Sequence, residues 1–208
     1  MIFYSHIQAT AFEMLLSVLL ALPLSCILAL SFKYSPSIKK ILMPCFVLLQ
    51  NLPMFVLAPL LLSCFGWGLF SILLPTILML AFPLTLSFNK GLEATPTDVI
   101  NFYKCHGASE FKILISIRVP FALPYFFSGL KIAAASSATG ALAGEWAGAQ
   151  KGLGVLMQIF RRQFDIEGVF ICLACTVGLS LLFYTIATLV EKMILFGCYG
   201  FKKRMLVS

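Results

Sequence analysis

The chain has 208 residues, of which 61% are hydrophobic and only 11% are charged. Soluble domains carry about a quarter charged residues, so this composition excludes a conventional soluble globule, a disordered chain and a disulfide scaffold. Because a spanning helix uses about 20 apolar residues, the length allows five or six spans and no separate soluble catalytic domain. The composition therefore predicts an integral membrane protein.

Five apolar segments predict spanning helices, so the expected fold is all-α. The stretch between Lys40 and Lys90 holds 49 residues without a charge, which suits two spans joined by a turn at Gly66, Trp67 and Gly68. We interpret the first segment as a retained helix, because it is longer than the apolar region of a signal peptide. The expected helices cover residues 7–32, 41–64, 69–88, 119–143 and 169–190 of a single transmembrane domain over residues 1–208.

The basic residues predict the orientation of these five helices. Eleven Lys and Arg residues fall on one side of the membrane and three on the other, and Lys131 lies within a span. Basic residues concentrate on the cytoplasmic side, so we expect the N-terminus outside and the C-terminus in the cytoplasm. The net charge of +7 then reflects topology and anionic lipid, and not nucleic acid.

The predicted cytoplasmic loop over residues 89–118 contains a short amphipathic helix. Thr97 is its expected cap, with Asp98 in the first turn. One face is apolar through Val99, Phe102, Tyr103 and His106, which recur at i, i+3, i+4 and i+7. Such a helix either lies on the lipid surface or docks in the groove of a partner, and its pattern favours neither. Gly107 is expected to end the helix, and a second helix is expected to start at Ser109 and Glu110.

The same loop resembles the cytoplasmic signature of ABC-transporter permeases, Glu-Ala-Ala-x-x-x-Gly-(nine residues)-Ile-x-Leu-Pro. Gly107, Ile117 and Pro120 match it, whereas Asn101, Phe102 and Tyr103 replace Glu-Ala-Ala. In that family the loop is the coupling helix, which docks into a cleft of the ATP-hydrolysing subunit. The residues that the resemblance assigns to ATPase coupling are Asp98, Val99, Asn101, Phe102, Tyr103, Gly107, Ala108, Ile117 and Pro120.

The resemblance extends from about His6 to Lys192 and indicates the importer branch for nitrate, sulfonates, taurine and the pyrimidine precursor of thiamine. It is carried by Leu-Gln-Asn-Leu-Pro at 49–53, Phe-Gly-Trp-Gly at 65–68, Gly-Glu-Trp at 144–146 and Gly-Leu-Gly at 152–154. Many members have a further helix at the N-terminus, and this chain resembles the five-helix variant.

The resemblance implies a type I ABC importer permease in the bacterial cytoplasmic membrane. Its expected partners are ATP-binding subunits, a second permease copy or paralogue, an extracytoplasmic substrate-binding protein and membrane lipid. ATP and Mg are expected on the partner ATPase, and no cofactor, metal or catalytic residue is expected in this chain. No Gly-x-x-x-x-Gly-Lys-[Ser/Thr] motif occurs in the sequence.

A second set of residues is assigned to either the translocation pathway or helix packing. Four of them are glycines that recur every four residues, a spacing that lets helices approach closely in lipid. We expect Lys131 to face the bundle or to extend toward the cytoplasm. Glu145 is a functional carboxylate, lies in interfacial water, or pairs with Lys151. The set comprises Gln50, Asn51, Lys131, Gly140, Gly144, Glu145, Trp146, Gly148 and Gly152.

The competing function is a secondary transporter driven by protons or sodium ions. It would use intramembrane acids, and Glu13 and Glu145 are the available ones. That class offers no role for the long cytoplasmic loop and its docking-type helix.

Overall fold

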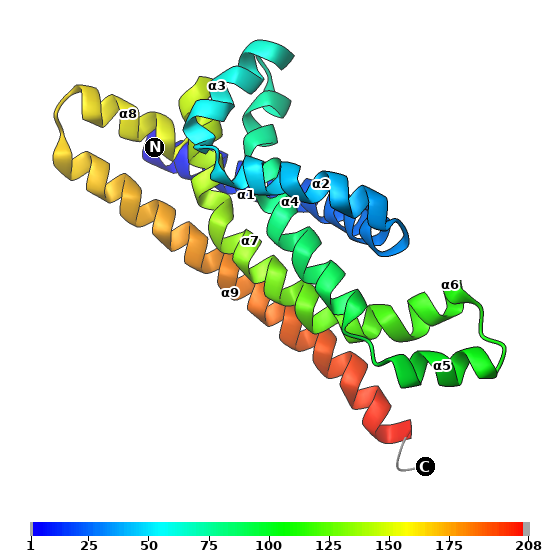
Figure 1. Ribbon diagram of the computed structural model, residues 1–208. Helices are drawn as coiled ribbons and strands as arrows, with labels where there is room; N and C mark the ends of the chain where they lie inside the picture. Colours follow the sequence, from blue (N-terminus) through cyan, green and yellow to red (C-terminus); the bar gives the residue numbers. More distant parts are fainter. Residues whose placement is uncertain (1, 206–208) are drawn as a thin grey trace.

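The computed structural model describes the backbone of residues 2–205 and the side chains of residues 3–196, and over this range it contains helices and connections but no strand (Figure 1). The elements in chain order are α1 (Ile2–Tyr34), α2 (Pro36–Asn51), α3 (Met54–Phe65), α4 (Leu69–Glu93), α5 (Thr97–Cys105), α6 (Glu110–Ile113), a π-helical turn (Leu114–Arg118), α7 (Val119–Gly148), α8 (Leu153–Arg162) and α9 (Ile166–Met205). The chain has the all-α fold that its composition predicts.

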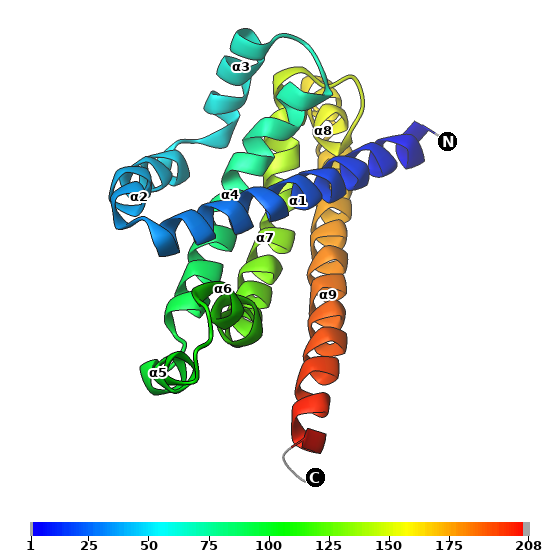
Figure 2. The same cartoon turned by 90° about the vertical axis from the view of Figure 1, so that its right-hand side faces the viewer.

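The centre of the molecule is the antiparallel pair α4 and α7, with α1 crossing both and α9 running along α7 (Figures 1 and 2). Apolar residues of α1, α4 and α7 form the main buried cluster, which includes Val18, Leu73, Leu80, Leu84 and Ala133. The outward faces carry large exposed hydrophobic side chains, as expected of helices that meet lipid.

Four helical stretches are long and apolar enough to cross a membrane, and a fifth span results if the bent pair α2 and α3 is counted as one. The sequence predicts one helix over 41–64, but the structure bends it by 111° between α2 and α3. Pro53 causes the break, because proline restricts the preceding Leu52 to an extended conformation, here with ψ of 130°.

The helix predicted to start at Ser109 and Glu110 is continuous with the span predicted over 119–143. Helix α6, the π-helical turn and α7 run without a break from Glu110 to Gly148. The π-helical turn inserts one wider turn between the loop and the span. Such turns are rare in proteins, and those that occur are often found at functional sites.

Helix α8 was not predicted, although its sequence carries the signal. Leu153, Leu156, Met157 and Phe160 recur at i, i+3, i+4 and i+7 and pack on the start of α1 and α9. Helix α8 and the beginning of α1 lie at one end of the molecule, and α5 lies at the other (Figure 1). The C-terminal residues 206–208, which we expect in the cytoplasm, lie outside the described residues.

Candidate functional site

Helix α5 projects beyond the ends of α4 and α7 and is held by a single inward face (Figures 1 and 2). Ile100 is buried and Val99 half-buried, whereas Asp98 and Asn101 are exposed. The helix therefore has an anchored side and a side that faces away from the rest of the chain.

The outward side of α5 carries an aromatic patch formed by Phe102, Tyr103 and His106. The Phe102 side chain is 59% exposed and that of Tyr103 is 37% exposed. The ring centroids of Phe102 and His106 lie 4.3 Å apart, and His106 Nδ1 is 2.8 Å from the Phe102 carbonyl oxygen. These contacts hold an apolar surface of fixed shape outside the core.

Gly107 ends α5 as predicted, with a positive φ of 76°. The Gly107 N–H bonds the Lys104 carbonyl and the Ala108 N–H bonds the Tyr103 carbonyl, both at 3.0 Å. This is the Schellman pattern, in which glycine takes the left-handed position at the lowest steric cost. An ion pair of 2.5 Å between Lys104 and Glu110 closes the loop on the other side.

Of the two predicted helix starts, the one at Ser109 is confirmed and the one at Thr97 is wrong by one residue. Ser109 caps α6, because its hydroxyl accepts from the Lys112 N–H at 3.3 Å. Thr97 is not a cap, since it is the first residue of α5 and Pro96 occupies the cap position without a side-chain hydrogen bond. Proline restricts φ at this position, here to −57°, and its side chain offers no acceptor to the first turn of α5.

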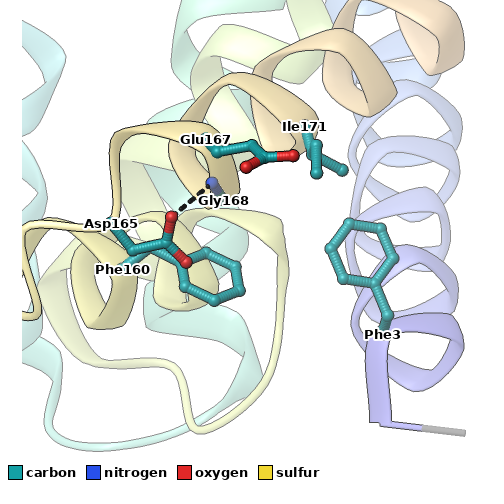
Figure 3. A pocket seen from close by; sticks show the side chains of 6 residues that line it. All are labelled: Phe3, Phe160, Asp165, Glu167, Gly168 and Ile171. Carbon is teal, nitrogen blue, oxygen red and sulfur yellow. Dashed lines mark hydrogen bonds between the residues drawn. The ribbon is translucent and has the colours of Figure 1, made fainter.

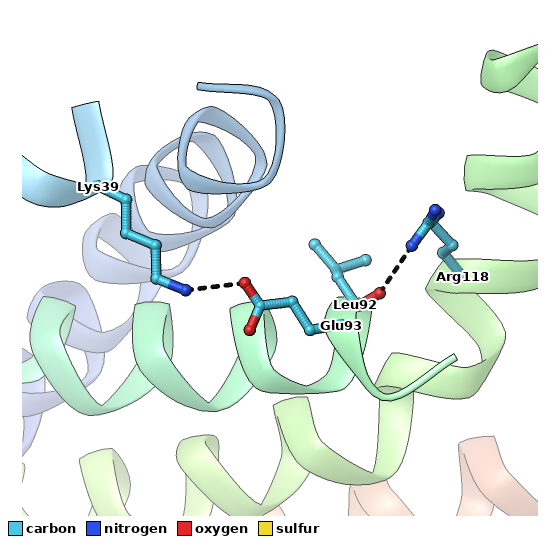
Figure 4. A network of polar contacts seen from close by, with 4 residues as sticks. All are labelled: Lys39, Leu92, Glu93 and Arg118. Atoms are coloured by element: carbon cyan, nitrogen blue, oxygen red, sulfur yellow. Dashed lines mark hydrogen bonds and ion pairs between the residues drawn. The ribbon is translucent and has the colours of Figure 1, made fainter. Parts of the chain in front are cut away.

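The root of the loop is tied to the central helices (Figure 4). Arg118 Nη1 donates to the Leu92 carbonyl at the end of α4 over 3.2 Å, and Lys39 of α2 pairs with Glu93 at 2.8 Å. Ile117 is buried in the same region, Ala108 is half-buried and Pro120 is exposed. These contacts join the loop to α4 and α2.

Gln50 and Asn51 form hydrogen bonds to backbone carbonyls. Gln50 Nε2 donates to the Met79 carbonyl of α4 at 3.0 Å. That carbonyl is free because Pro83, four residues later, has no N–H to donate to it. Asn51 Nδ2 donates to the Val47 carbonyl within its own helix at 2.7 Å.

The predicted glycine stripe lies against the helices next to α7 within this chain. A Cβ atom at Gly140 would meet Thr76, one at Gly144 would meet the Ile72 backbone, and one at Gly148 would meet Leu62 and Trp67. Gly152 belongs to the turn after α7 and has a φ of 141°. The first two glycines therefore set the close approach of α4 and α7.

The two charged residues of this set are both partnered. Lys131 Nζ forms an ion pair of 2.7 Å with Glu191 Oε2 on α9. Glu145 is 2% exposed and accepts hydrogen bonds from the Thr10 hydroxyl and the Gly154 N–H, each at 2.5 Å. Its environment is therefore neither interfacial water nor the exposed Lys151. Trp146 is 44% exposed, and its carbonyl accepts from Gln158 at 3.3 Å.

A hollow of about 280 Å³ lies at the end of the molecule opposite α5 (Figure 3). Phe3, Phe160 and Ile171 form its apolar walls, and Glu167 and Asp165 face it. Asp165 Oδ1 accepts from the Gly168 N–H at 2.9 Å, so this carboxylate caps the start of α9.

Comparison with known proteins agrees with this geometry. Residues 21–195 match the family described as binding-protein-dependent transport system inner membrane component. A probable ABC transporter permease protein of Haemophilus influenzae is 35% identical over 192 residues, which cover 92% of this chain and 78% of the relative. The formylaminopyrimidine transport permease protein ThiX of Halalkalibacterium halodurans is 31% identical over 81% of this chain and 68% of its own length. A chain of the inward-facing MetNI methionine ABC transporter shares the fold, with a TM-score of 0.74 at 18% identity over 93% of this chain and 96% of that chain.

Proposed function

Because the chain belongs to the family of binding-protein-dependent transport system inner membrane components, and is an ABC importer permease subunit, we propose that α5 is its docking element for the ATPase. The observation that carries this proposal is the aromatic patch. Phe102, Tyr103 and His106 are held outside the core on a helix of fixed geometry, and an amphipathic helix of this kind fits a groove on a partner.

The proposed assembly contains two ATP-binding subunits, a second permease copy or paralogue, and an extracytoplasmic binding protein that delivers the solute. ATP and Mg are held by the ATPase subunits. In this arrangement α5 lies in the cytoplasm, and the beginning of α1 lies on the outer side with α8. The opposite placement of α5 and α8 along α7 supports opposite sides of the membrane for these two helices (Figure 1).

The transport step follows from the way the loop is attached. Closure of the ATPase pair on ATP displaces α5, and the continuous helix from Glu110 to Gly148 carries the displacement into the membrane. Arg118 and its bond to the Leu92 carbonyl move α4 together with α7. The pair then rocks between inward-facing and outward-facing arrangements, while the chemistry occurs on the partner.

We propose a small solute of the nitrate, sulfonate, taurine or thiamine pyrimidine-precursor class. The formylaminopyrimidine permease relative favours the pyrimidine member of this class. The binding protein is expected to select the solute, because it makes the first specific contact.

The test is affinity purification of the chain from native membranes in mild detergent, followed by identification of the copurifying proteins and an ATPase assay. We expect a stoichiometric soluble ATPase with the wild type and its loss when Phe102 and Tyr103 are both changed to Ser. Phe164→Asn is the matched control, since Phe164 is an aromatic residue 90% exposed outside the patch and its φ of 56° suits asparagine.

Two results would contradict the proposal. One is an ATPase that remains bound to the Phe102→Ser, Tyr103→Ser variant. The other is a purified chain that has no ATPase and transports solute under a proton or sodium gradient, which would instead favour the secondary-transporter hypothesis.

A further inference from the structure

One face of α1 is polar and buried, although α1 is an apolar helix. Four polar residues of its first half follow helical spacing and point into the bundle. At most 8% of the surface of any of them is exposed; they are His6, Thr10, Glu13 and Ser17. Polar side chains that turn away from lipid are expected to pair with other polar groups inside the bundle.

The first half of this face contacts the turn between α7 and α8. His6 Nδ1 lies 3.0 Å from the Gly152 nitrogen and 2.9 Å from its carbonyl oxygen, so it accepts or donates according to its tautomer. Thr10 Oγ1 accepts from the Leu153 N–H at 2.8 Å and donates to Glu145 Oε1. These contacts join residues about 140 positions apart in the sequence, namely 146, 143 and 135 positions.

The donors around Glu145 identify it as the ionised member of the cluster. Its Oε1 receives the Thr10 hydroxyl and its Oε2 receives the Gly154 N–H, each at 2.5 Å. The Thr10 hydroxyl accepts from the Leu153 N–H and donates its own hydrogen to Glu145. A carboxylate accepts at both oxygens, whereas a protonated carboxyl group must donate from one of them.

Glu13 is 6% exposed and lies one turn after Thr10 on the same buried face of α1, so its carboxyl group faces the Glu145 that Thr10 binds. Two buried carboxyl groups that face each other form a hydrogen bond only when a proton lies between them, since two carboxylates are both acceptors. Glu13 Oε2 is fully buried and has no hydrogen-bond partner within the described part of the chain, so an ionised Glu13 would leave a buried carboxylate oxygen without a donor.

Among residues 3–196, the ion pairs involve Glu93, Glu110 and Glu191, and neither Glu13 nor Glu145. The other titratable side chain in the network is His6, while α8 contributes backbone N–H groups and Lys151 of the turn is exposed. A metal ion fits poorly, because N–H and O–H donors already occupy both oxygens of Glu145.

We propose that Glu13 and Glu145 together form a binding site for one proton, which joins α1 to the turn between α7 and α8. When the proton leaves to solvent hydroxide, two carboxylates face each other in a buried site, and the contact between α1 and α7 weakens. The site lies at the end of α7 opposite the coupling loop, about 40 Å away along a helix of 30 residues. This inference is independent of the ATPase docking proposed above.

The test uses the full chain purified in detergent, with infrared spectroscopy and thermal unfolding between about pH 6 and pH 9. Only eight Asp and Glu residues occur in the sequence, so the C=O band of a protonated carboxyl group is resolvable. We expect this band in the wild type at neutral pH and its disappearance as the pH rises. The apparent melting temperature is expected to fall over the same range, because the contribution of a bound proton is lost when the proton dissociates.

Glu13→Gln is the decisive variant, since its amide donates a permanent N–H to Glu145. It should lack the infrared band, keep a melting temperature close to that of the wild type at neutral pH, and lose the alkaline decrease. Glu145→Gln should melt lower by roughly 5 °C or more, because its amide leaves the Thr10 hydroxyl or the Gly154 N–H without an acceptor. Glu191→Gln is the matched control and should retain both the band and the pH profile, and His6→Gln should retain the alkaline decrease.

The proposal is overturned if the wild type shows no protonated carboxyl band at neutral pH, or if Glu13→Gln keeps the band or the alkaline decrease. It is also overturned if Glu191→Gln removes the band. If Glu13→Gln fails to accumulate, the wild type alone provides the test. Its infrared band and its melting temperature must then decrease over the same pH range, and a decrease over different ranges would overturn the proposal.

Discussion

Lys131 of α7 and Glu191 of α9 form an ion pair of 2.7 Å inside the helical bundle, with the two side chains 23% and 16% exposed. The pair explains how a lysine is accommodated within an apolar segment. It also holds α9 against α7. A second polar contact between the two helices is the hydrogen bond from the Ser180 hydroxyl to the Ala135 carbonyl, at 2.5 Å.

Removal of one partner of this ion pair should destabilise the protein. We expect Lys131→Ala or Glu191→Ala to lower the free energy of unfolding by about 1–3 kcal/mol, between the values for exposed and buried pairs. The exchange Lys131→Glu with Glu191→Lys should recover most of the loss. Apparent melting temperatures in detergent check this prediction, and an exchange variant no more stable than the single variants would show that the pair does not hold the helices.

Gly107 should tolerate asparagine better than alanine. The position has a φ of 76°, and nothing lies within 4 Å of a Cβ atom built there, so the cost is that of the backbone alone. Alanine is expected to strain the loop by about 1 kcal/mol, whereas asparagine adopts the left-handed conformation more readily. We expect Gly107→Ala and Gly107→Asp to reduce the coupling of ATP hydrolysis to uptake without loss of membrane insertion, and Gly107→Asn to retain more of it.

Parallel measurements of uptake, ATP hydrolysis and membrane content check this prediction. Normal transport by Gly107→Asp would mean that α5 is not the coupling element. Equal losses with asparagine and alanine would show that the positive φ is not the cause.

Gly144 should be intolerant of any side chain. A Cβ atom there would clash with the Ile72 backbone, which a side-chain rotation cannot relieve. We expect Gly144→Ala to cost about 1–3 kcal/mol through separation of α4 from α7. Gly178→Ala on α9 is the control, because nothing lies within 4 Å of its Cβ position and alanine favours the helix. Yield and melting temperature distinguish the two, and equal behaviour would contradict the close-approach argument.

The sequence predicts the elements whose cause is local. Gly107 ends α5 and Ser109 starts α6, because a turn glycine and a capping hydroxyl act on their immediate neighbours. The single span predicted over 41–64 is wrong at Pro53, although the cause of the bend is also local, because the apolar run continues through it and hydropathy does not register a break in the backbone. The short α8 was not predicted for a different reason: its apolar positions lie among glycines and charged residues, which lower the hydropathy of the segment.

Composition and local pattern alone therefore determined that the chain is a helical membrane protein with an amphipathic helix in its longest polar loop. Only the tertiary structure decided which polar residues meet. Glu13 stands 132 positions before Glu145 in the sequence, and Lys131 stands 60 before Glu191. A buried polar group must find its partner wherever the helices cross, and the crossings depend on the packing of the whole bundle rather than on any single segment.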